Sequence, residues 1–304
     1  MKPKSQKIKK IALIAPSGIV SQTKLKKSKE NIKRLGKEPV VFPNAMNRYG
    51  YLAGKDDERL NDIQQAFEDK SIDAIFCIRG GYGATRILDK IDYEIIKKNP
   101  KIFVGFSDIT AYQSAFFVKA GLVSFHGIIG ASNFTDYIIQ QLQDLIFCPV
   151  ENYILPHTSF DVFTQGKAEG RIVGGNLSLL VSMIGTEYIF TFTDKLVFIE
   201  EIAEPPYKID RMLNHLLMAT DIKKAAGIVF GSFRGCTPEE NDTLPENSLR
   251  VEEIIEEKFA GLNIPIVYNL NFGHIENSLI FPIGVKARLD TQNKKIQLLE
   301  KATI

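Results

Sequence analysis

Residues 73–108 read DAIFCIRGGYGATRILDKIDYEIIKKNPKIFVGFSD. Two short apolar runs, DAIFCI and KIFVGF, each end in small or polar residues, and a segment expected to start a helix at Ala84 lies between them. A buried strand, a helical crossover and a second buried strand are typical of a βαβ unit, whose strands pair in parallel. The stretch therefore predicts an α/β fold with a parallel sheet.

The same alternation extends on both sides of this stretch. It predicts helices over Thr23–Leu35 and Asp57–Asp69, with strands in KIALIAPSG, PVVF and GLVSF. In such sheets, ligands bind at the carboxyl ends of the strands. Those ends carry the polar and glycine-rich segments Ser17-Gly18, Arg79-Gly80-Gly81, Ser107 and His126-Gly127.

The chain changes character near residue 150. The segment that follows has no clear hydrophobic period and contains Pro156, so we expect a linker over 151–165 between a domain at 1–150 and another at 166–304. In the second domain, strands and helices alternate again, and apolar alternation on both sides of residues 291–293 predicts a β-hairpin. The predicted elements there are strands GRIVGG, KLVFIE, GIVFG and IPIVYNL, and helices Asn176–Ile184, Tyr207–Met218 and Leu249–Phe259.

Composition excludes several classes of protein. The 304 residues include 38 basic and 36 acidic side chains, so the net charge of +2 gives no case for binding nucleic acid or an anionic membrane. The three cysteines are too far apart for a disulfide framework or a metal knuckle, which suits a reducing compartment. The apolar run IALIA is shorter than the about 7–15 residues of a signal peptide core. We therefore expect a cytoplasmic protein.

Ser107 is the candidate nucleophile. It follows a strand and precedes a helix, where the unpaired N–H groups of the helix start can stabilise an oxyanion. The N–H of Asp108, together with that of Gly80 or Gly81, would form such an oxyanion hole, and Asp108 is also the expected N-cap of the helix. Two alternatives stay open: a serine that only caps a helix, and a phosphate-binding loop, although neither GxGxxG nor GxxxxGK[ST] is present.

The sequence offers four histidines as the general base. His274 follows a predicted strand and a glycine, which suits a side chain presented to a cleft. His126 also follows a strand and is the second candidate, whereas His157 lies in the linker and His215 in a predicted helix. No HExxH motif or paired histidine spacing indicates a metal site.

The run KLVFIEEIAEPPYKID supplies the acid that would orient the histidine. Glu200 directly ends an apolar strand and is the first choice, because strand alternation turns Glu201 to the opposite face. Glu204 and Asp210 are the other carboxylates of this run, and a carboxylate that caps the next helix is the structural alternative.

These residues lie within six blocks that, in this order, resemble the LD-carboxypeptidase family of serine peptidases. The blocks are IALIAPSG, AIFCIRGGYGATRIL, VGFSDITAYQSA, GRIVGGNLSLLVSMIGT, LVFIEEIAEPPYKIDRML and NLNFGHIENSLIFPIG. The resemblance implies a flavodoxin-like first domain, a smaller mixed β/α second domain and a triad of Ser107, Glu200 and His274. It departs from the family only where Glu201 replaces a common aspartate.

The resemblance also implies a reaction. Murein tetrapeptides would be cleaved between an L-centre diamino acid and terminal D-alanine, without metal or organic cofactor, by a homodimer. Arg79 and Arg86 are candidates for binding the substrate carboxylate, and the alternative for both is a role as loop anchors. The alternatives are a self-immunity peptidase that cleaves a peptide–nucleotide antibiotic of the microcin C type, and a non-catalytic ligand-binding module.

Overall fold

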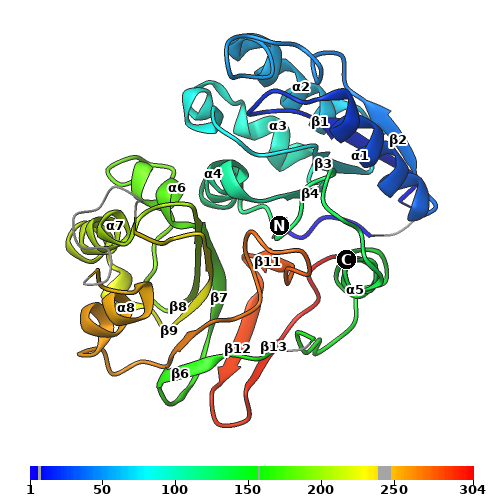
Figure 1. Cartoon of the computed structure of the whole chain (residues 1–304). Helices are drawn as coiled ribbons and strands as arrows, with labels where there is room; N and C mark the ends of the chain where they lie inside the picture. Colours follow the sequence, from blue (N-terminus) through cyan, green and yellow to red (C-terminus); the bar gives the residue numbers. More distant parts are fainter. Residues whose placement is uncertain (6–7, 157, 239–247) are drawn as a thin grey trace.

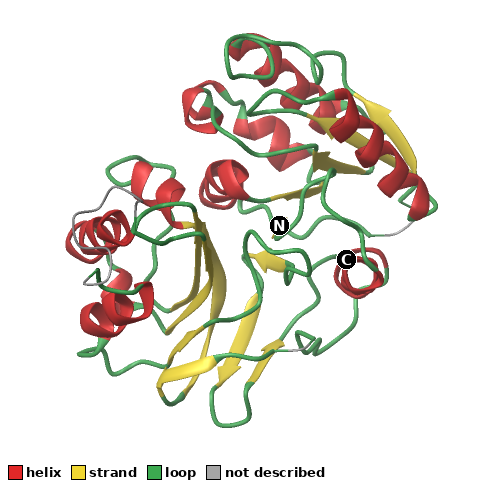
Figure 2. Ribbon diagram, viewed as in Figure 1, coloured by secondary structure: helices red, strands yellow, loops and turns green. Residues whose placement is uncertain are grey.

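The structure is a computed structural model that describes residues 1–5, 8–156, 158–238 and 248–304. Two sheets carry the core, and helices cover their faces (Figure 1, Figure 2). His157, expected in the linker, lies outside the described residues.

The first sheet has the strand order of a flavodoxin-like fold. Its first five strands run β2-β1-β3-β4-β5 and pair in parallel, as the sequence and the resemblance predicted. A strand from near the end of the chain, β11, adds antiparallel to β5. The strands are β1 (Lys10–Ile14), β2 (Glu38–Val41), β3 (Ala74–Cys77), β4 (Ile102–Gly105), β5 (Ser124–His126) and β11 (Phe281–Ile283).

Helices pack on both faces of this sheet (Figure 2). They are α1 (Gln22–Arg34), α2 (Asp56–Glu68), α3 (Tyr93–Lys98), α4 (Thr110–Ala120) and α5 (Asp136–Leu142), with a short π-helical turn at Gln143–Phe147. The first two confirm the predicted helices to within a residue. The helix expected from Ala84 is wrong, because this segment forms two 3₁₀ turns, Ala84–Arg86 and Leu88–Lys90. Between them Ile87 has φ −128°, which is outside the helical region and interrupts a continuous helix.

The second sheet is mixed, with the order β13-β12-β7-β8-β9-β10-β6. Its central strands β7 to β10 are parallel, and helices α6, α7 and α8 cover one face (Figure 1). The hairpin of β12 and β13 confirms the predicted one. The bounds are β6 (Asp161–Thr164), β7 (Lys167–Asn176), β8 (Lys195–Ile202), β9 (Gly227–Arg234), β10 (Ile266–Tyr268), β12 (Lys286–Asp290), β13 (Lys295–Leu298), α6 (Leu177–Ser182), α7 (Pro206–Ala219), a 3₁₀ turn at Ile222–Lys224 and α8 (Val251–Phe259).

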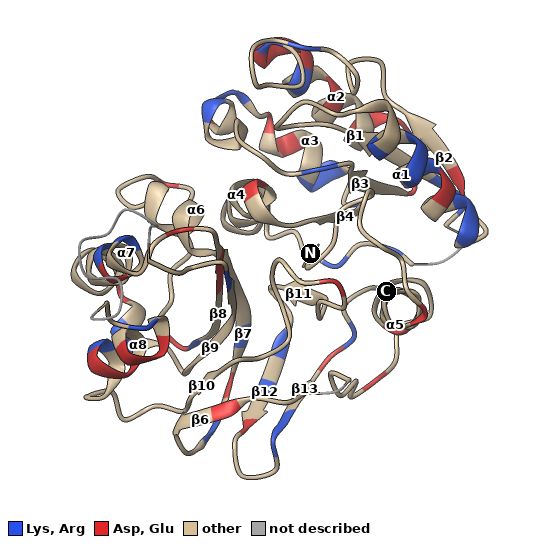
Figure 3. Cartoon of the chain, in the orientation of Figure 1, with Lys and Arg blue, Asp and Glu red and all other residues tan. Residues whose placement is uncertain are grey.

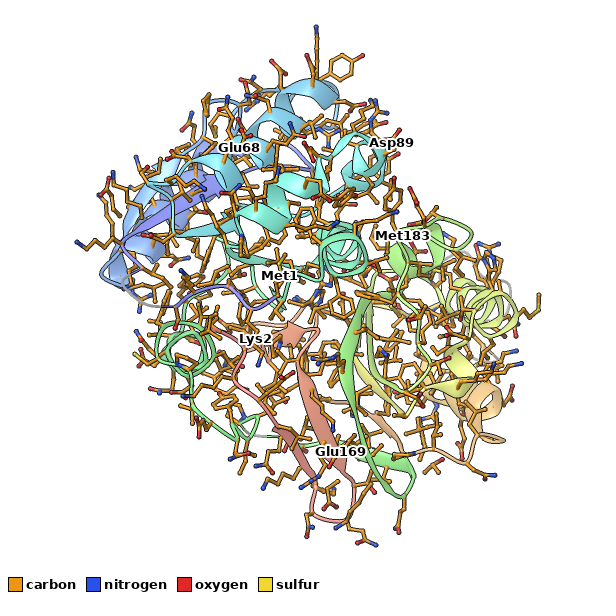
Figure 4. The ribbon with its side chains drawn as sticks, turned by 180° about the vertical axis from the view of Figure 1, so that it is seen from behind. Met1, Lys2, Glu68, Asp89, Glu169 and Met183 are labelled. Atoms are coloured by element: carbon orange, nitrogen blue, oxygen red, sulfur yellow. The ribbon has the colours of Figure 1, made fainter. Side chains whose placement is uncertain are left out.

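The chain crosses between the two sheets more often than the sequence suggested. Strand β6 lies inside the segment expected to be a linker, and β11 carries part of the second half into the first sheet. The two ends of the chain also pair, since Ser5 N–H donates to Ile304 O at 2.7 Å and Ile304 N–H to Pro3 O at 3.0 Å. Met1 and Lys2 lie near the middle of the molecule in Figure 4. The division at residues 150 and 166 stays a prediction.

The surface carries both basic and acidic side chains. Lys and Arg line α1, whereas α2 and α8 carry both signs (Figure 3). Within the described ranges, none of the helices combines the length and the apolar character needed to span a membrane.

Candidate active site

Ser107 sits in a strained turn between β4 and α4. Its φ is +67°, whereas Phe106 before it is fully extended, and a 3₁₀ turn over Ser107–Ile109 leads into the helix. A non-glycine residue in the left-handed region is a sign of strain that proteins often keep at functional sites. Gly105 makes the turn possible, because a Cβ there would lie 2.6 Å from Ile109 Cγ2. The turn thus has the strand–turn–helix shape of a nucleophile elbow without the GxSxG sequence.

Asp108 does not cap α4, contrary to the sequence prediction. The 3₁₀ turn takes up Ser107–Ile109, so the helix starts at Thr110 and Ile109 occupies the N-cap position. The Asp108 carboxylate instead accepts a hydrogen bond from Ala84 N–H at 2.9 Å, and burial raises the pKa of this group. Asp108 therefore ties the nucleophile turn to the end of the glycine-rich loop.

Gly80, in the glycine-rich loop, lies directly against Ser107. A Cβ at Gly80 would be 3.0 Å from Ser107 Cβ and 3.2 Å from Ser107 Oγ, so a larger residue would crowd the hydroxyl. Gly18, at the end of β1, donates its N–H to Gly80 O at 3.1 Å. Three strand ends of the first sheet thus meet at Ser107, as the parallel topology predicted.

Glu200 and His274 form the second half of the site. Glu200 Oε2 lies 2.7 Å from His274 Nδ1, and the Glu200 side chain is completely buried while that of His274 is 15 % exposed. Gly273 has φ +110°, and a Cβ there would lie 2.8 Å from Glu200 Oε2, so glycine allows the close approach. Because an ionised carboxylate can only accept, Nδ1 donates and Nε2 keeps the lone pair that a general base needs.

The neighbouring glutamate faces the other way, as strand alternation predicted. Glu201 accepts hydrogen bonds from Ser178 N–H at 2.7 Å, Ser178 Oγ at 2.6 Å and Asn176 Nδ2 at 2.7 Å, and burial raises its pKa. Glu204 pairs with Lys208 and Asp210 with Lys258. Glu200 is the member of this run whose carboxylate contacts His274.

Phe106 connects the two halves of the site. Its ring centroid lies 4.7 Å from that of His274 and 6.1 Å from that of His126. Among the described residues, Ser107 Oγ and His274 form no hydrogen bond, although the residue before the serine packs on the imidazole. Serine–histidine bonds are often long before substrate binds, so this geometry is compatible with a triad. The structure brings Glu200 and His274 into contact, and it places Phe106, the residue before Ser107, against the imidazole.

His126 is enclosed beneath this site. The Gln113 amide donates to Gly105 O at 3.1 Å and Phe125 O at 2.8 Å, so its oxygen must accept from His126 Nδ1 at 2.9 Å. Burial lowers the pKa of His126 to about 4. The negative charge of Glu200 opposes this shift by raising the pKa, and the positive charge of His274 adds a smaller lowering. His126 is 1 % exposed and stays neutral at physiological pH, which separates it from the role of a solvent-reachable base. His215 is exposed on α7, as expected.

Models of known protein families match both halves of the chain. The model described as LD-carboxypeptidase N-terminal domain matches residues 11–127, and the one described as LD-carboxypeptidase C-terminal domain matches residues 169–289. The chain belongs to the LD-carboxypeptidase family. The resemblance seen in the six sequence blocks is thereby confirmed, as is the two-sheet mixed α/β fold.

Individual family members cover nearly the whole chain. A probable murein peptide carboxypeptidase of Bacillus subtilis is 38% identical over 93% of this chain and 89% of its own length. The crystal structure of a muramoyltetrapeptide carboxypeptidase from Oxalobacter formigenes has a TM-score of 0.83 and 30% identity, and the match covers 95% of this chain and 97% of that one. The microcin self-immunity protein MccF of Escherichia coli is 24% identical over 94% of this chain and 91% of its own length.

Three residues of this LD-carboxypeptidase site carried no sequence signal that singled them out. Phe106 packs at a tilt against His274, and Thr110 Oγ1 accepts from Asn176 N–H at 3.1 Å, joining α4 to the end of β7. Gly175 is the contact point, because a Cβ there would lie 2.6 Å from Thr110 and 3.2 Å from His126 Cε1. The glycine pair in GRIVGG was the one available hint. No cluster of three or more metal-ligating side chains occurs in the part of the chain that the structure describes.

Proposed function

We propose that this chain is a serine carboxypeptidase that hydrolyses the amide between an L-centre diamino acid and the terminal D-alanine of murein tetrapeptides. Ser107 acts as the nucleophile, His274 as the general base and Glu200 as the residue that orients it. The observation that carries the proposal is the 2.7 Å contact between Glu200 and His274 Nδ1, which leaves Nε2 free to accept a proton. The His274 ring packs against Phe106, the residue before Ser107, and Ser107 itself lies in a strained turn. The similarity to a probable murein peptide carboxypeptidase of Bacillus subtilis and to a muramoyltetrapeptide carboxypeptidase of Oxalobacter formigenes supports the murein substrate.

The reaction follows from the roles of these groups. His274 Nε2 takes the hydroxyl proton of Ser107 as the oxygen attacks the scissile carbonyl, and Glu200 stabilises the resulting imidazolium. The imidazolium then protonates the leaving amine, and D-alanine departs. Water, deprotonated by the same imidazole, releases the acyl group and restores Ser107.

Backbone N–H groups stabilise the oxyanion in this mechanism. We assign this role to Asp108, at the turn before α4, and to Gly80 or Gly81 in the neighbouring loop. The close approach of Gly80 to Ser107 Oγ supports the assignment, since donors must lie about 3 Å from the developing charge.

Mass spectrometry of defined muropeptides tests the proposal. The wild type is expected to convert a tetrapeptide into a tripeptide plus D-alanine, and Ser107→Ala to lose this activity. Ser182→Ala, on the exposed face of α6, is the matched control and keeps it. Full activity in Ser107→Ala would contradict the proposed nucleophile, and an inactive wild type would contradict the substrate.

A self-immunity peptidase is the second candidate, because the chain is also similar to a microcin self-immunity protein. It would use the same triad on a different amide. Hydrolysis of an aminoacyl-sulfamoyl adenylate in place of the murein tetrapeptide would favour it. The non-catalytic alternative required Ser107, Glu200 and His274 to be mutually out of reach, and the direct contact of the last two speaks against it.

The cytoplasmic location and the homodimer stay predictions. The resemblance alone implies the dimer, and sedimentation velocity of the purified chain measures its assembly state directly. Fractionation of the cells that make the protein measures its location.

A further inference from the structure

An open groove of about 510 Å³ lies along the glycine-rich loop that contacts Ser107. Arg79 and Gly81 of the glycine-rich loop line the groove. They are the neighbours in sequence of Gly80, which lies against Ser107. The groove therefore adjoins the loop that lies against the Ser107 hydroxyl. The lining residues are Gly18, Ile19, Tyr51, Arg79, Gly81 and Tyr82.

Arg79 places a fixed positive charge in the groove. Its Nε donates to Gly80 O at 3.1 Å and its Nη1 to Ile19 O at 2.8 Å, so the guanidinium is held on two sides. The Nη2 end faces Gly81, where a Cβ would come within 3.0 Å of it. Glycine at this position leaves that end of the guanidinium uncrowded for a ligand.

No carboxylate neutralises this charge among the described residues, since the ion pairs there do not include Arg79. The positive charge of Arg79 also affects Lys24. The pKa of the Lys24 ammonium is lowered, mainly by burial and to a smaller extent by the charge of Arg79. A half-buried guanidinium with backbone partners alone is prepared to receive an anion from outside the chain, because charged hydrogen bonds to carboxylates are among the stronger ones.

The other arginines near the site differ from Arg79. Arg86 is already committed, with Nε 2.9 Å and Nη2 3.0 Å from the two oxygens of Asp56. Arg234 is exposed and donates to His274 O at 3.2 Å, so it supports the loop that carries the histidine. The two candidates that sequence analysis left equal, Arg79 and Arg86, are therefore distinguished by the structure.

We propose that Arg79 binds the terminal α-carboxylate of the peptide substrate and thereby restricts the enzyme to the last residue of the chain. This inference rests on the proposed function. In a carboxypeptidase substrate the α-carboxylate lies one residue beyond the scissile carbonyl, at about the 3.8 Å that separates neighbouring Cα atoms. A cation on the residue next to Gly80 is at the right place in the chain to meet it.

Two substrates that differ only in this charge test the proposal: the tetrapeptide acid and its C-terminal amide. The wild type is expected to prefer the acid. Arg79→Met is expected to lower kcat/KM for the acid about 10- to 100-fold, with the loss mainly in KM, and to leave the amide unchanged. Arg79→Lys, which keeps a charge but loses the fork of donors, is expected to fall between them and guards against misfolding of the methionine variant.

Arg86→Met is the matched control, since it removes a guanidinium of the same loop that Asp56 already holds, and its preference for the acid is expected to be that of the wild type. Arg234→Met is expected to keep the same acid-to-amide ratio. The inference is overturned if Arg79→Met, folded as judged by its melting curve, retains the preference, or if Arg86→Met or Arg234→Met loses it. A wild type that hydrolyses neither substrate contradicts the proposed function itself, and the inference falls with it.

Discussion

Glu200 and His274 are joined by a 2.7 Å hydrogen bond between side chains, whereas Ser107 is held by backbone: a left-handed turn, Gly105 beneath it and Gly80 against it. Glu200 comes from β8 of the second sheet, His274 from the loop between β10 and β11, and Ser107 from the turn after β4 of the first sheet. A hydrogen bond between side chains thus orders one half of the site, whereas backbone conformation and close packing order the other half. Substitutions in the two halves should therefore impair the protein in different ways.

The largest expected effect comes from removing the charge of Glu200. In Glu200→Gln the amide can stabilise the wrong imidazole tautomer, so we expect kcat to fall on the order of 10⁴-fold while the melting temperature changes little. Steady-state kinetics with a murein tetrapeptide, paired with thermal unfolding, provides the measurement.

Glu201→Gln is the matched control on the same strand. Glu201 accepts bonds from Ser178 and Asn176 on the opposite face, so its substitution should cost about 1–3 kcal/mol of unfolding free energy and leave kcat largely intact. If the two variants behaved alike, the division of roles between neighbouring glutamates would be wrong.

A second comparison concerns the surface where the two halves meet. A Cβ at Gly175 would lie 2.6 Å from Thr110, and the φ of Gly175 is +139°, a backbone conformation that strains any other residue. Gly175→Ala should therefore destabilise the fold by about 3 kcal/mol or more. Activity should fall together with stability. Gly185→Ala also has a positive φ, +84°, but nothing within 4 Å, and should cost only about 1–2 kcal/mol. Urea unfolding of both variants measures the difference, and equal losses would show that the inter-sheet contact contributes nothing.

The last expected effect is a pH dependence of stability from His126, which appears only in acid. Its folded pKa of about 4 lies below the ordinary value of 6.5, so the unfolded chain binds the extra proton first and stability falls as pH drops through this window. Relative to His126→Gln, the wild type should lose about 3 kcal/mol between pH 6.5 and pH 4. Parallel stability curves for the two proteins over this range would contradict a buried, neutral imidazole.

The five parallel strands of the first sheet were predictable from sequence because each is an apolar run followed by a polar or glycine-rich end. Its parallel order and the gathering of Ser107 and the Gly80 loop at one edge followed from that pattern. Strands β6 and β11 were not predicted, since each is only a few residues long and pairs with a strand far away in the sequence. Their pairing depends on the tertiary fold and leaves no local period.

The site shows the same limit. Glu200 and His274 were identifiable because Glu200 ends an apolar run and His274 follows one. Strand alternation separated Glu200 from Glu201. The cap role expected of Asp108 was wrong, because the sequence did not reveal the 3₁₀ turn that delays the helix. The contacts of Phe106 and Gly175 join elements that are distant in the chain, and apart from the glycine pair in GRIVGG no neighbouring residue signals them.

The central claim is that Ser107, after β4, and His274, in the loop after β10, act as one catalytic unit. The most direct test is kcat for Ser107→Ala, His274→Ala and the double variant on a murein tetrapeptide. Because residues that act together lose their contribution together, we predict that each single variant is as impaired as the double one. Losses that multiply in the double variant, or a His274→Ala variant with nearly wild-type kcat, would contradict the account.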